Sequence, residues 1–395
     1  MAVAVKVILK PGKEQSLLRF HPWIFSGAIQ KIDGSPEEGD VVEVVGHNQQ
    51  FLAMGHYQIG SIAIRVLSFT PCTIDQTFYT EKIKLAYRLR VALGLAESVQ
   101  TNAYRLIHGE GDNLPGLIVD YYNGTAVAQM HSVGMYRDRK MIETAIKEVY
   151  GSSVKAIYNK SEGTLPYKAD LEPENGYVFG RPESKEAMEN GLRFYADWEK
   201  GQKTGFFVDQ RDNRALLEHY SKNRAVLNMF CYTGGFSFYA MRGGATQVHS
   251  VDSSERAIEL TKANVELNFP GDDRHQAFAM DAFKYLEKAG SNYDLIILDP
   301  PAFAKHQNVL NNAIKGYRRL NAKAFEVIKP GGILFTFSCS QVVTKDIFRT
   351  MVFSAAAKAG RQVSILHQIS QPADHPVNIY HPEGEYLKGL VLHVV

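Results

Sequence analysis

Residues 225–240 read AVLNMFCYTGGFSFYA, an apolar run that leads into two adjacent glycines. A near-continuous apolar run is typical of a strand that is buried on both faces of a parallel sheet. Gly234 and Gly235 allow the backbone to turn tightly after this strand and to approach a ligand closely. The stretch therefore predicts the first strand of an open α/β sheet, with a binding turn at its carboxyl end.

Three further apolar runs extend this pattern toward the C-terminus. They are QVHSVD (247–252), YDLIILDP (293–300) and GGILFTFS (331–338), and residues 254–268 and 315–328 have helical spacing. Strands that alternate with helices predict a Rossmann-like, doubly wound α/β domain, which we assign to residues 191–395. Ligands bind beyond the carboxyl ends of the strands in such a sheet, so the residues that follow each run form the candidate site.

The N-terminal half has a different pattern. Residues 1–72 contain short runs of alternating apolar and polar residues between glycines, which predict a small β-barrel or sandwich. Residues 73–190 combine a helical segment near residues 77–95, a second helix near 136–150 and a hairpin that turns at Asn123-Gly124. We interpret this middle part as an α+β domain.

Composition limits the class of protein. A chain of 395 residues with 45% apolar residues exceeds one hydrophobic core and predicts two or three domains. The first residues lack the pattern of a signal peptide and no run is long enough to cross a bilayer, so we expect a cytosolic protein without membrane contact. Cys72, Cys231 and Cys339 are odd in number and have no CxxC spacing, which argues against disulfides and against a metal site. The net charge of +2 neither favours nor excludes a nucleic-acid partner.

The residues after the second and third strands suggest the cofactor. Asp252 lies 18 residues beyond Gly234, a spacing suited to a carboxylate that binds ribose hydroxyls. The G-x-G-x-x-G pattern of dinucleotide sites is absent, which favours S-adenosylmethionine, because that cofactor has a ribose but no phosphate. Asp281 is then a candidate for the adenine amine, with Ala282 and Phe283 against the ring. The alternative for both aspartates is a helix N-cap.

The sequence DPPAF (299–303) follows the next strand. Two prolines exclude both helix and ladder, so a rigid extended loop is expected, with Asp299 at its root and Phe303 near its tip. A nucleic-acid base could stack on this phenylalanine, and the alternative is an ordinary rigid loop.

Cys339 follows the last apolar run, on the same predicted edge as Gly234, Asp252 and Asp299. A thiolate that adds to carbon 6 of a pyrimidine makes carbon 5 nucleophilic enough to accept a methyl group, and later elimination restores the ring. Asp299 is a candidate acid at nitrogen 3 of the base. A lone cysteine in an apolar strand is more often packing, but its position beside the predicted methyl donor favours catalysis.

Several long motifs, in order, resemble a known family, the bacterial large-subunit ribosomal RNA cytosine-5 methyltransferases. They are HPWIFSGAI (21–29), KTGFFVDQR (203–211), NMFCYTGGFSFYA (228–240), DPPAF (299–303), FTFSCS (335–340) and HPEGEYLKGL (381–390). The resemblance covers nearly the whole chain. It implies an N-terminal PUA domain, a middle RNA-recognition domain and a C-terminal methyltransferase domain.

The resemblance also implies a reaction and a site. The reaction is S-adenosylmethionine-dependent methylation of carbon 5 of a specific cytidine in 23S ribosomal RNA, with Cys339 as the attacking thiolate. Arg211 belongs to the 203–211 motif that borders the cofactor pocket. The expected cofactor-binding residues are Phe230, Tyr232, Gly234, Gly235, Asp252, Ser253, Asp281, Ala282, Asp299, Lys203, Thr204 and Gln210.

Two alternative reactions stay open. Many RNA cytosine-5 methyltransferases have a second cysteine where this chain has Pro301, and the pairing of DPP with SCS also resembles uridine-5 methyltransferases. The DPPAF loop further resembles loops that orient an exocyclic base amine for direct methylation, a reaction that needs no thiol. A third reading, from another class, is an RNA-binding module without catalysis.

The RNA-binding residues are less distinctive, because no tract is strongly basic. Lys315, Arg318 and Arg319 share one face of a predicted helix close to the site, and they are candidates for phosphate contact. Arg19 and Phe303 are further candidates for RNA contact. The target base must be unpaired or flipped out, in free 23S RNA or in a partly assembled large subunit. The sequence leaves the oligomeric state open, with a homodimer as one option.

Overall fold

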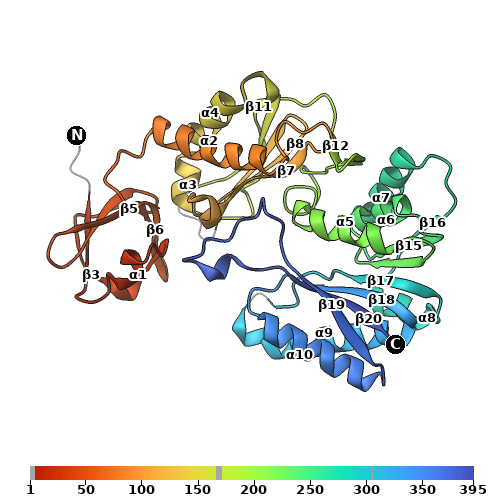
Figure 1. Ribbon diagram of the computed structural model, residues 1–395. Coiled ribbons are helices and arrows are strands. Elements are labelled where there is room, and N and C mark those ends of the chain that lie inside the picture. Colours follow the sequence, from red (N-terminus) through yellow and green to blue (C-terminus); the bar gives the residue numbers. More distant parts are fainter. Residues whose placement is uncertain (1–4, 166–170, 305) are drawn as a thin grey trace. The chain divides into compact units, whose positions relative to one another are not determined.

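The computed structural model describes residues 5–165, 171–304 and 306–395 (Figure 1). The chain folds into two compact units, each formed by segments distant in sequence. The first comprises Met1–Gly191, Ala196–Val208 and Ala373–Gly384, and the second comprises Leu192–Tyr195, Asp209–Pro372 and Glu385–Val395. The three-domain boundaries expected from the sequence stay a prediction.

The described part of the first unit contains, in its N-terminal segment, a six-stranded sheet with the strand order β2-β6-β5-β4-β1-β3. Alternate residues of β1 and β4 are buried in its core, as the period-2 pattern predicts. The short helix α1 spans Gln15–Leu18. The strands are β1 (Lys6–Leu9), β2 (Trp23–Phe25), β3 (Ile29–Asp33), β4 (Val41–Val45), β5 (Phe51–Tyr57) and β6 (Ile62–Ser68).

A second sheet of the first unit has the order β11-β10-β9-β8-β7. Strands β8 and β9 form the predicted hairpin, in which Asn123 and Gly124 have φ angles of 43° and 92°, as a tight two-residue turn requires. Helix α2 (Gln76–Ala92) packs on α4 (Arg139–Tyr150), after the short α3 (Val133–Arg137). The strands of this sheet are β7 (Ala103–His108), β8 (Leu117–Tyr122), β9 (Thr125–Met130), β10 (Ala156–Asn159) and β11 (Gly176–Gly180), and β12 (Glu186–Glu189) lies outside it.

The described part of the second unit contains a seven-stranded sheet with the order β16-β15-β14-β17-β18-β20-β19. The first five strands in this order are parallel, which confirms the doubly wound fold, and β20 pairs antiparallel with both of its neighbours. This antiparallel pair was not expected from the sequence. The strands are β14 (Ala225–Met229), β15 (Gln247–Asp252), β16 (His275–Ala279), β17 (Tyr293–Leu298), β18 (Ile328–Ser338), β19 (Val363–Ile369) and β20 (Lys388–Val394), and β13 spans Leu192–Tyr195.

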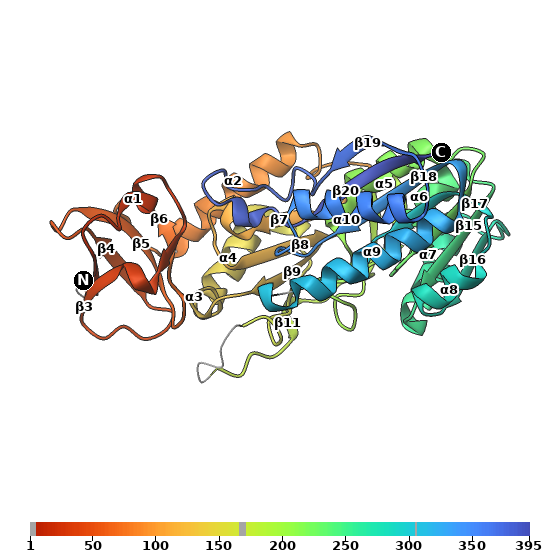
Figure 2. The ribbon, with the colours of Figure 1, turned by 90° about the horizontal axis from the view of Figure 1, so that it is seen from below.

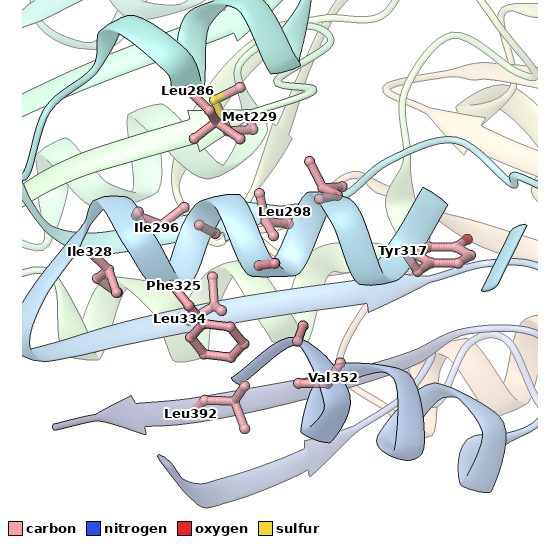
Figure 3. Packing of buried hydrophobic residues seen from close by; sticks show 14 of the residues in the cluster. Met229, Leu286, Ile296, Leu298, Tyr317, Phe325, Ile328, Leu334, Val352 and Leu392 are labelled. Atoms are coloured by element: carbon pink, nitrogen blue, oxygen red, sulfur yellow. The ribbon is translucent and has the colours of Figure 1, made fainter. Parts of the chain in front are cut away.

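Apolar layers cover both faces of this sheet. Ile296 and Leu298 of β17 join one core cluster, whereas Leu295 and Ile297 join the cluster on the other face. This explains why the strand sequences are apolar throughout rather than alternating. Figure 3 shows part of the first cluster, in which Phe325 packs near Leu334 and Leu392.

Helices connect the parallel strands, and α9 and α10 lie side by side (Figure 2). Helix α9 begins five residues earlier than the sequence predicted, whereas α7 matches the expected range closely. The helices are α5 (Arg211–Tyr220), α6 (Gly235–Arg242), α7 (Glu255–Asn268), α8 (Ala282–Lys288), α9 (Leu310–Val327) and α10 (Lys345–Lys358). In the described residues, no helix combines the length and the apolar character that crossing a membrane requires.

Candidate active site

The candidate site lies at the carboxyl ends of the parallel strands of the second unit. Because β16, β15, β14, β17 and β18 run in one direction, the residues that follow them share one edge of the sheet. Asp281, Asp252, Gly234, Asp299 and Cys339 follow these five strands in that spatial order. The structure therefore gathers the main residues predicted from the sequence on one edge.

The turn after β14 is shaped by its backbone. Phe230, Tyr232 and Gly234 have φ angles of 59°, 49° and 83°, a left-handed region that is unfavourable for the two aromatic residues. A Cβ atom on Gly234 would lie 2.8 Å from Cγ2 of Thr261, so glycine is also needed for packing against α7. The hydroxyl of Thr261 donates to the carbonyl of Tyr232 (2.8 Å) and holds the turn. Gly235 is buried and begins α6.

Asp252 fixes this turn with both carboxylate oxygens. Oδ2 accepts from the amide of Tyr232 (3.0 Å), and Oδ1 accepts from the amide of Ser254 (2.9 Å). A carboxylate has further lone pairs, so the half-buried side chain can still accept from ribose hydroxyls. The N-cap of α7 is Ser254 rather than Asp252, and Ser253 between them is exposed.

Asp281 is the N-cap of α8. Its Oδ1 accepts from the amide of Lys284 (3.0 Å), and the residue is exposed. Ala282 is buried and Phe283 is half-buried, with the guanidinium of Arg319 4.4 Å from the ring centroid. The capping role and a contact with the adenine amine use different lone pairs, so they are compatible.

Asp299 is held by a chain of amides. The side chain of Gln210 donates to Oδ2 of Asp299 (3.0 Å), and Asn213 donates to the amide oxygen of Gln210 (2.6 Å). Burial, and then the nearby Asp209 carboxylate, raise the pKa of Asp299 to about 7, against smaller opposing effects of Gln210 and Arg214. A carboxyl group with this pKa retains a proton in much of the population at neutral pH and can act as an acid.

Cys339 is half-buried, and its thiol donates to the carbonyl of Pro300 (3.9 Å) in the DPPAF loop. The serines on either side are anchored to α9, since Ser338 donates to the hydroxyl of Tyr317 (3.0 Å), which lies 3.3 Å from Oγ of Ser340. Successive side chains of an extended chain point to opposite sides, so this anchoring directs Cys339 away from α9, to the face where it borders the second core cluster.

The Cys339 thiol is protonated at rest. Burial, and then the carboxylates of Asp299 and Asp209, raise its pKa to about 12. Lys388 acts in the opposite direction. The site therefore needs a proton acceptor, or a change in its charges, before the sulfur can attack.

The 203–211 motif divides between the two units. Lys203 is exposed, whereas Thr204 is buried and donates to Oδ2 of Asp120 (2.5 Å) within the first unit. Gln210 and the buried Arg211 belong to the second unit, where Gln210 holds Asp299. Of the motif residues predicted for the cofactor, Gln210 is thus in contact with another predicted site residue.

The predicted RNA-binding residues differ in exposure. Arg19 is exposed on the first unit, and Lys315, Arg318 and Arg319 are exposed on α9. Phe303 is half-buried and packs against Tyr317, with ring centroids 4.6 Å apart.

Sequence reasoning missed three residues of this site. Asp209 is the acidic neighbour of Gln210 and accepts a hydrogen bond from the hydroxyl of Tyr386 (2.7 Å). Tyr317 resembles any core residue of an amphipathic helix. Lys388 is a single lysine at the start of the apolar run KGLVLHV, and that contrast was a signal that could have been used.

Comparisons with known proteins define the class first. Residues 104–383 match the family model of an S-adenosylmethionine-dependent methyltransferase, and residues 7–69 match a PUA-like domain. The crystal structure of SMU.776, named as a methyltransferase and complexed with SAH, has a TM-score of 0.84 at 25% identity and covers 98% of this chain and 99% of its own. The protein is an S-adenosylmethionine-dependent methyltransferase with an N-terminal PUA-like domain.

Two curated relatives give the particular family. A protein of Tolumonas auensis named "Ribosomal RNA large subunit methyltransferase I" is 40% identical over 401 residues, and one of the same name from Enterobacter sp. is 39% identical over 400 residues. In both cases the match covers 100% of each chain. The chain belongs to the ribosomal RNA large subunit methyltransferase I family.

Proposed function

We propose that this protein methylates carbon 5 of a specific cytidine in 23S ribosomal RNA through a covalent bond between Cys339 and carbon 6. The observation that carries the proposal is the position of Cys339 on the strand edge that also bears Asp299 and the cofactor turn. The printed names of the relatives support large-subunit ribosomal RNA as the substrate.

The reaction assigns a role to each of the two catalytic residues. The Cys339 thiol loses its proton to a base, and the sulfur adds to carbon 6 while Asp299 protonates nitrogen 3. S-adenosylmethionine would supply the methyl group to carbon 5 and leave as S-adenosylhomocysteine. A base then removes the carbon-5 proton, the double bond between carbons 5 and 6 reforms, and the carbon–sulfur bond breaks with its electron pair going to the sulfur. Nitrogen 3 returns its proton to Asp299. The raised pKa of Asp299, about 7, supports its role as the acid.

RNA binding in this proposal combines charge and stacking. Lys315, Arg318 and Arg319 on α9 contact phosphates near the target base, and Arg19 contacts flanking RNA. Phe303 lies on the loop that begins with Asp299 and is the residue against which a flipped base stacks. The substrate is free 23S RNA or a partly assembled subunit, and the protein works in the cytoplasm, where ribosomes are assembled.

Two competing products have specific support. The pairing of DPP with a downstream SCS is compatible with uridine as the target, and the DPPAF loop is compatible with methylation of an exocyclic amine. The amine reaction needs no thiolate, so the two chemistries respond differently to loss of the sulfur.

Mass spectrometry of nucleosides tests the proposal directly. Unmodified 23S ribosomal RNA is incubated with S-adenosylmethionine and either the wild-type protein or Cys339→Ala, and calorimetry checks that the variant still binds the cofactor. We expect 5-methylcytidine with the wild type only. Equal methylation by Cys339→Ala would exclude the covalent mechanism, and 5-methyluridine or an N-methylated base would show that the target is wrong.

A further inference from the structure

Lys388 is a buried cation next to the segment that carries Cys339. It begins β20 and pairs with Ser338, the residue before the cysteine, across the antiparallel ladder. Only 6% of the residue is exposed. Its ammonium group donates to the carbonyls of Ser340 (2.6 Å) and Val343 (2.7 Å), so it closes the turn that follows the cysteine.

The ammonium group has no direct countercharge. Within the described residues, no carboxylate lies at ion-pair distance from Lys388, and the nearest acidic residue in sequence, Glu385, pairs with Lys345. Burying an unpaired charge is unfavourable, and burial lowers the pKa of Lys388 to about 8. Methionine or leucine would fit an apolar strand at a smaller cost, so packing alone does not account for a lysine here.

The charged groups around Cys339 indicate a role for Lys388. Asp299 and Asp209 face the thiol from the β17 edge and from the segment before α5, and both raise its pKa. Lys388 lowers that pKa, and the Lys345–Glu385 pair is close enough to Lys388 to influence its own titration. If Lys388 lost its charge, a Cys339 thiolate would face the carboxylates of Asp299 and Asp209 without the cation that lowers its pKa.

We propose that Lys388 is a positioning residue for Cys339, because its ammonium group holds the Ser340–Val343 turn and stabilises the thiolate by charge. This inference deepens the proposed function and depends on it for its catalytic meaning. The effect on the thiol itself does not depend on which base is methylated, so the two ideas can fail separately.

Two variants separate the charge from the hydrogen bonds. Lys388→Gln keeps N–H donors for the two carbonyls but removes the charge, and Lys388→Met removes both. Lys358→Met is the control, because it removes an equal charge from an exposed side chain of α10 in the same unit. Alkylation by iodoacetamide is followed for each cysteine-containing peptide by mass spectrometry across a range of pH.

We expect Cys339 to be alkylated at least about tenfold more slowly in both Lys388 variants than in the wild type, and at an unchanged rate in Lys358→Met. A rate for Lys388→Gln equal to that of the wild type would overturn the charge role and leave only the hydrogen bonds. Cys231 reports on folding, because this buried thiol becomes reactive if a variant unfolds. If Lys388→Met unfolds, the comparison of Cys339 alkylation rates is restricted to Lys388→Gln and the wild type, both measured with S-adenosylmethionine bound.

Methyl transfer by the same variants completes the test. We expect kcat to fall with the alkylation rate in Lys388→Gln, while the KM for RNA changes by less than about twofold. If Cys339→Ala still methylates RNA, the proposed function fails even when Lys388 controls the thiol. If both Lys388→Gln and Lys388→Met alkylate and methylate at the wild-type rate, the positioning role fails and the proposed function stands.

Discussion

Cys231 and Cys339 both follow a strand of the same parallel sheet, but their surroundings differ. Cys231 is 5% exposed in the turn after β14, where its sulfur lies 3.8 Å from the hydroxyl of Thr261. Burial, and then the charge of Asp252, raise its pKa well above the usual range. Cys339 is half-buried between the DPPAF loop and the turn closed by Lys388, and its pKa rises less, to about 12.

The comparison shows that position at the strand ends is not enough to make a cysteine a nucleophile. Both thiols face an acidic side chain on the same sheet edge, so proximity to a carboxylate does not distinguish them. Exposure and a nearby cation distinguish Cys339 from Cys231, because a thiolate needs access to the substrate and a compensating positive charge. Cys231 has the surroundings of a packing residue, and Cys339 has those of a residue that can react.

Replacing each cysteine by serine gives the largest expected contrast. We expect Cys339→Ser to lower the initial rate of methyl transfer at least about 10³-fold, because serine has neither the nucleophilicity nor the leaving ability of a thiol. Cys231→Ser should change that rate less than about threefold. Transfer of radiolabelled methyl groups to RNA measures both, and equal losses in the two variants would contradict the assignment.

The pH dependence of kcat/KM probes the second catalytic group. The thiolate fraction of Cys339 rises about tenfold per pH unit up to its pKa of about 12. The protonated fraction of Asp299 is complete below its pKa of about 7 and falls about tenfold per unit above it. The product of the two fractions therefore rises up to about pH 7 and is level above it, until Lys388 begins to lose its charge near its pKa of about 8.

Asp299→Asn supplies the control for this profile. The variant has no titrating acid, so its kcat/KM should be lower but should continue to rise above neutral pH. Measurements between about pH 6 and pH 9 with both proteins distinguish the cases. A wild-type profile that keeps rising above pH 7 would exclude Asp299 as the proton donor.

The turn after β14, which contains Cys231, depends on its backbone conformation, and a substitution at Gly234 tests that dependence. Gly234→Ala adds a Cβ atom 2.8 Å from Thr261 Cγ2 at a φ of 83°, so strain and overlap add. We expect a loss of about 2–4 kcal/mol in the free energy of unfolding of the second unit and weaker cofactor binding. Gly360→Ala is the matched control, since Gly360 has a φ of 67° and open space around it. It should lose only about 1 kcal/mol by urea denaturation and should bind the cofactor normally.

Much of the second unit could be predicted from sequence because its strands are buried on both faces. The runs 225–230, 247–252, 293–300 and 331–338 all became strands, and the polar residues after them share one edge. Strand β19 was missed because most of its residues are half-buried or exposed, so the segment lacks the apolar signature. Its neighbour β20 is buried, but antiparallel insertion between two strands distant in sequence has no local signal.

The side-chain connections of the site were less predictable. Thr204 and Gln210 are close in sequence and belong to one motif, yet Thr204 bonds to Asp120 in the first unit and Gln210 bonds to Asp299 in the second. Spacing along a chain does not reveal where it passes from one unit to the next. Likewise, Tyr317 and Lys388 act through residues on other elements, and such tertiary contacts cannot be read from a local pattern.

Among these variants, Tyr317→Phe should have the smallest effect. It tests whether the side chains next to Cys339 hold its sulfur in position. It removes the hydroxyl that anchors Ser338 and Ser340, and we expect about 1–2 kcal/mol of lost stability and a threefold to tenfold lower kcat. Tyr293→Phe is the matched control in the same core cluster, at the opposite, amino end of β17, where its hydroxyl contacts His249 and Tyr285.

The two tyrosine variants should lose similar stability but differ in activity. Only Tyr317 is linked to the serines that orient the cysteine, so Tyr293→Phe should retain nearly full methyl transfer. Equal activity losses would mean that the core as a whole, rather than the anchored serines, sets the reactivity of Cys339. Unequal losses at equal stability would show that the difference between Cys339 and Cys231 extends beyond exposure and charge to the side chains that hold the sulfur in position.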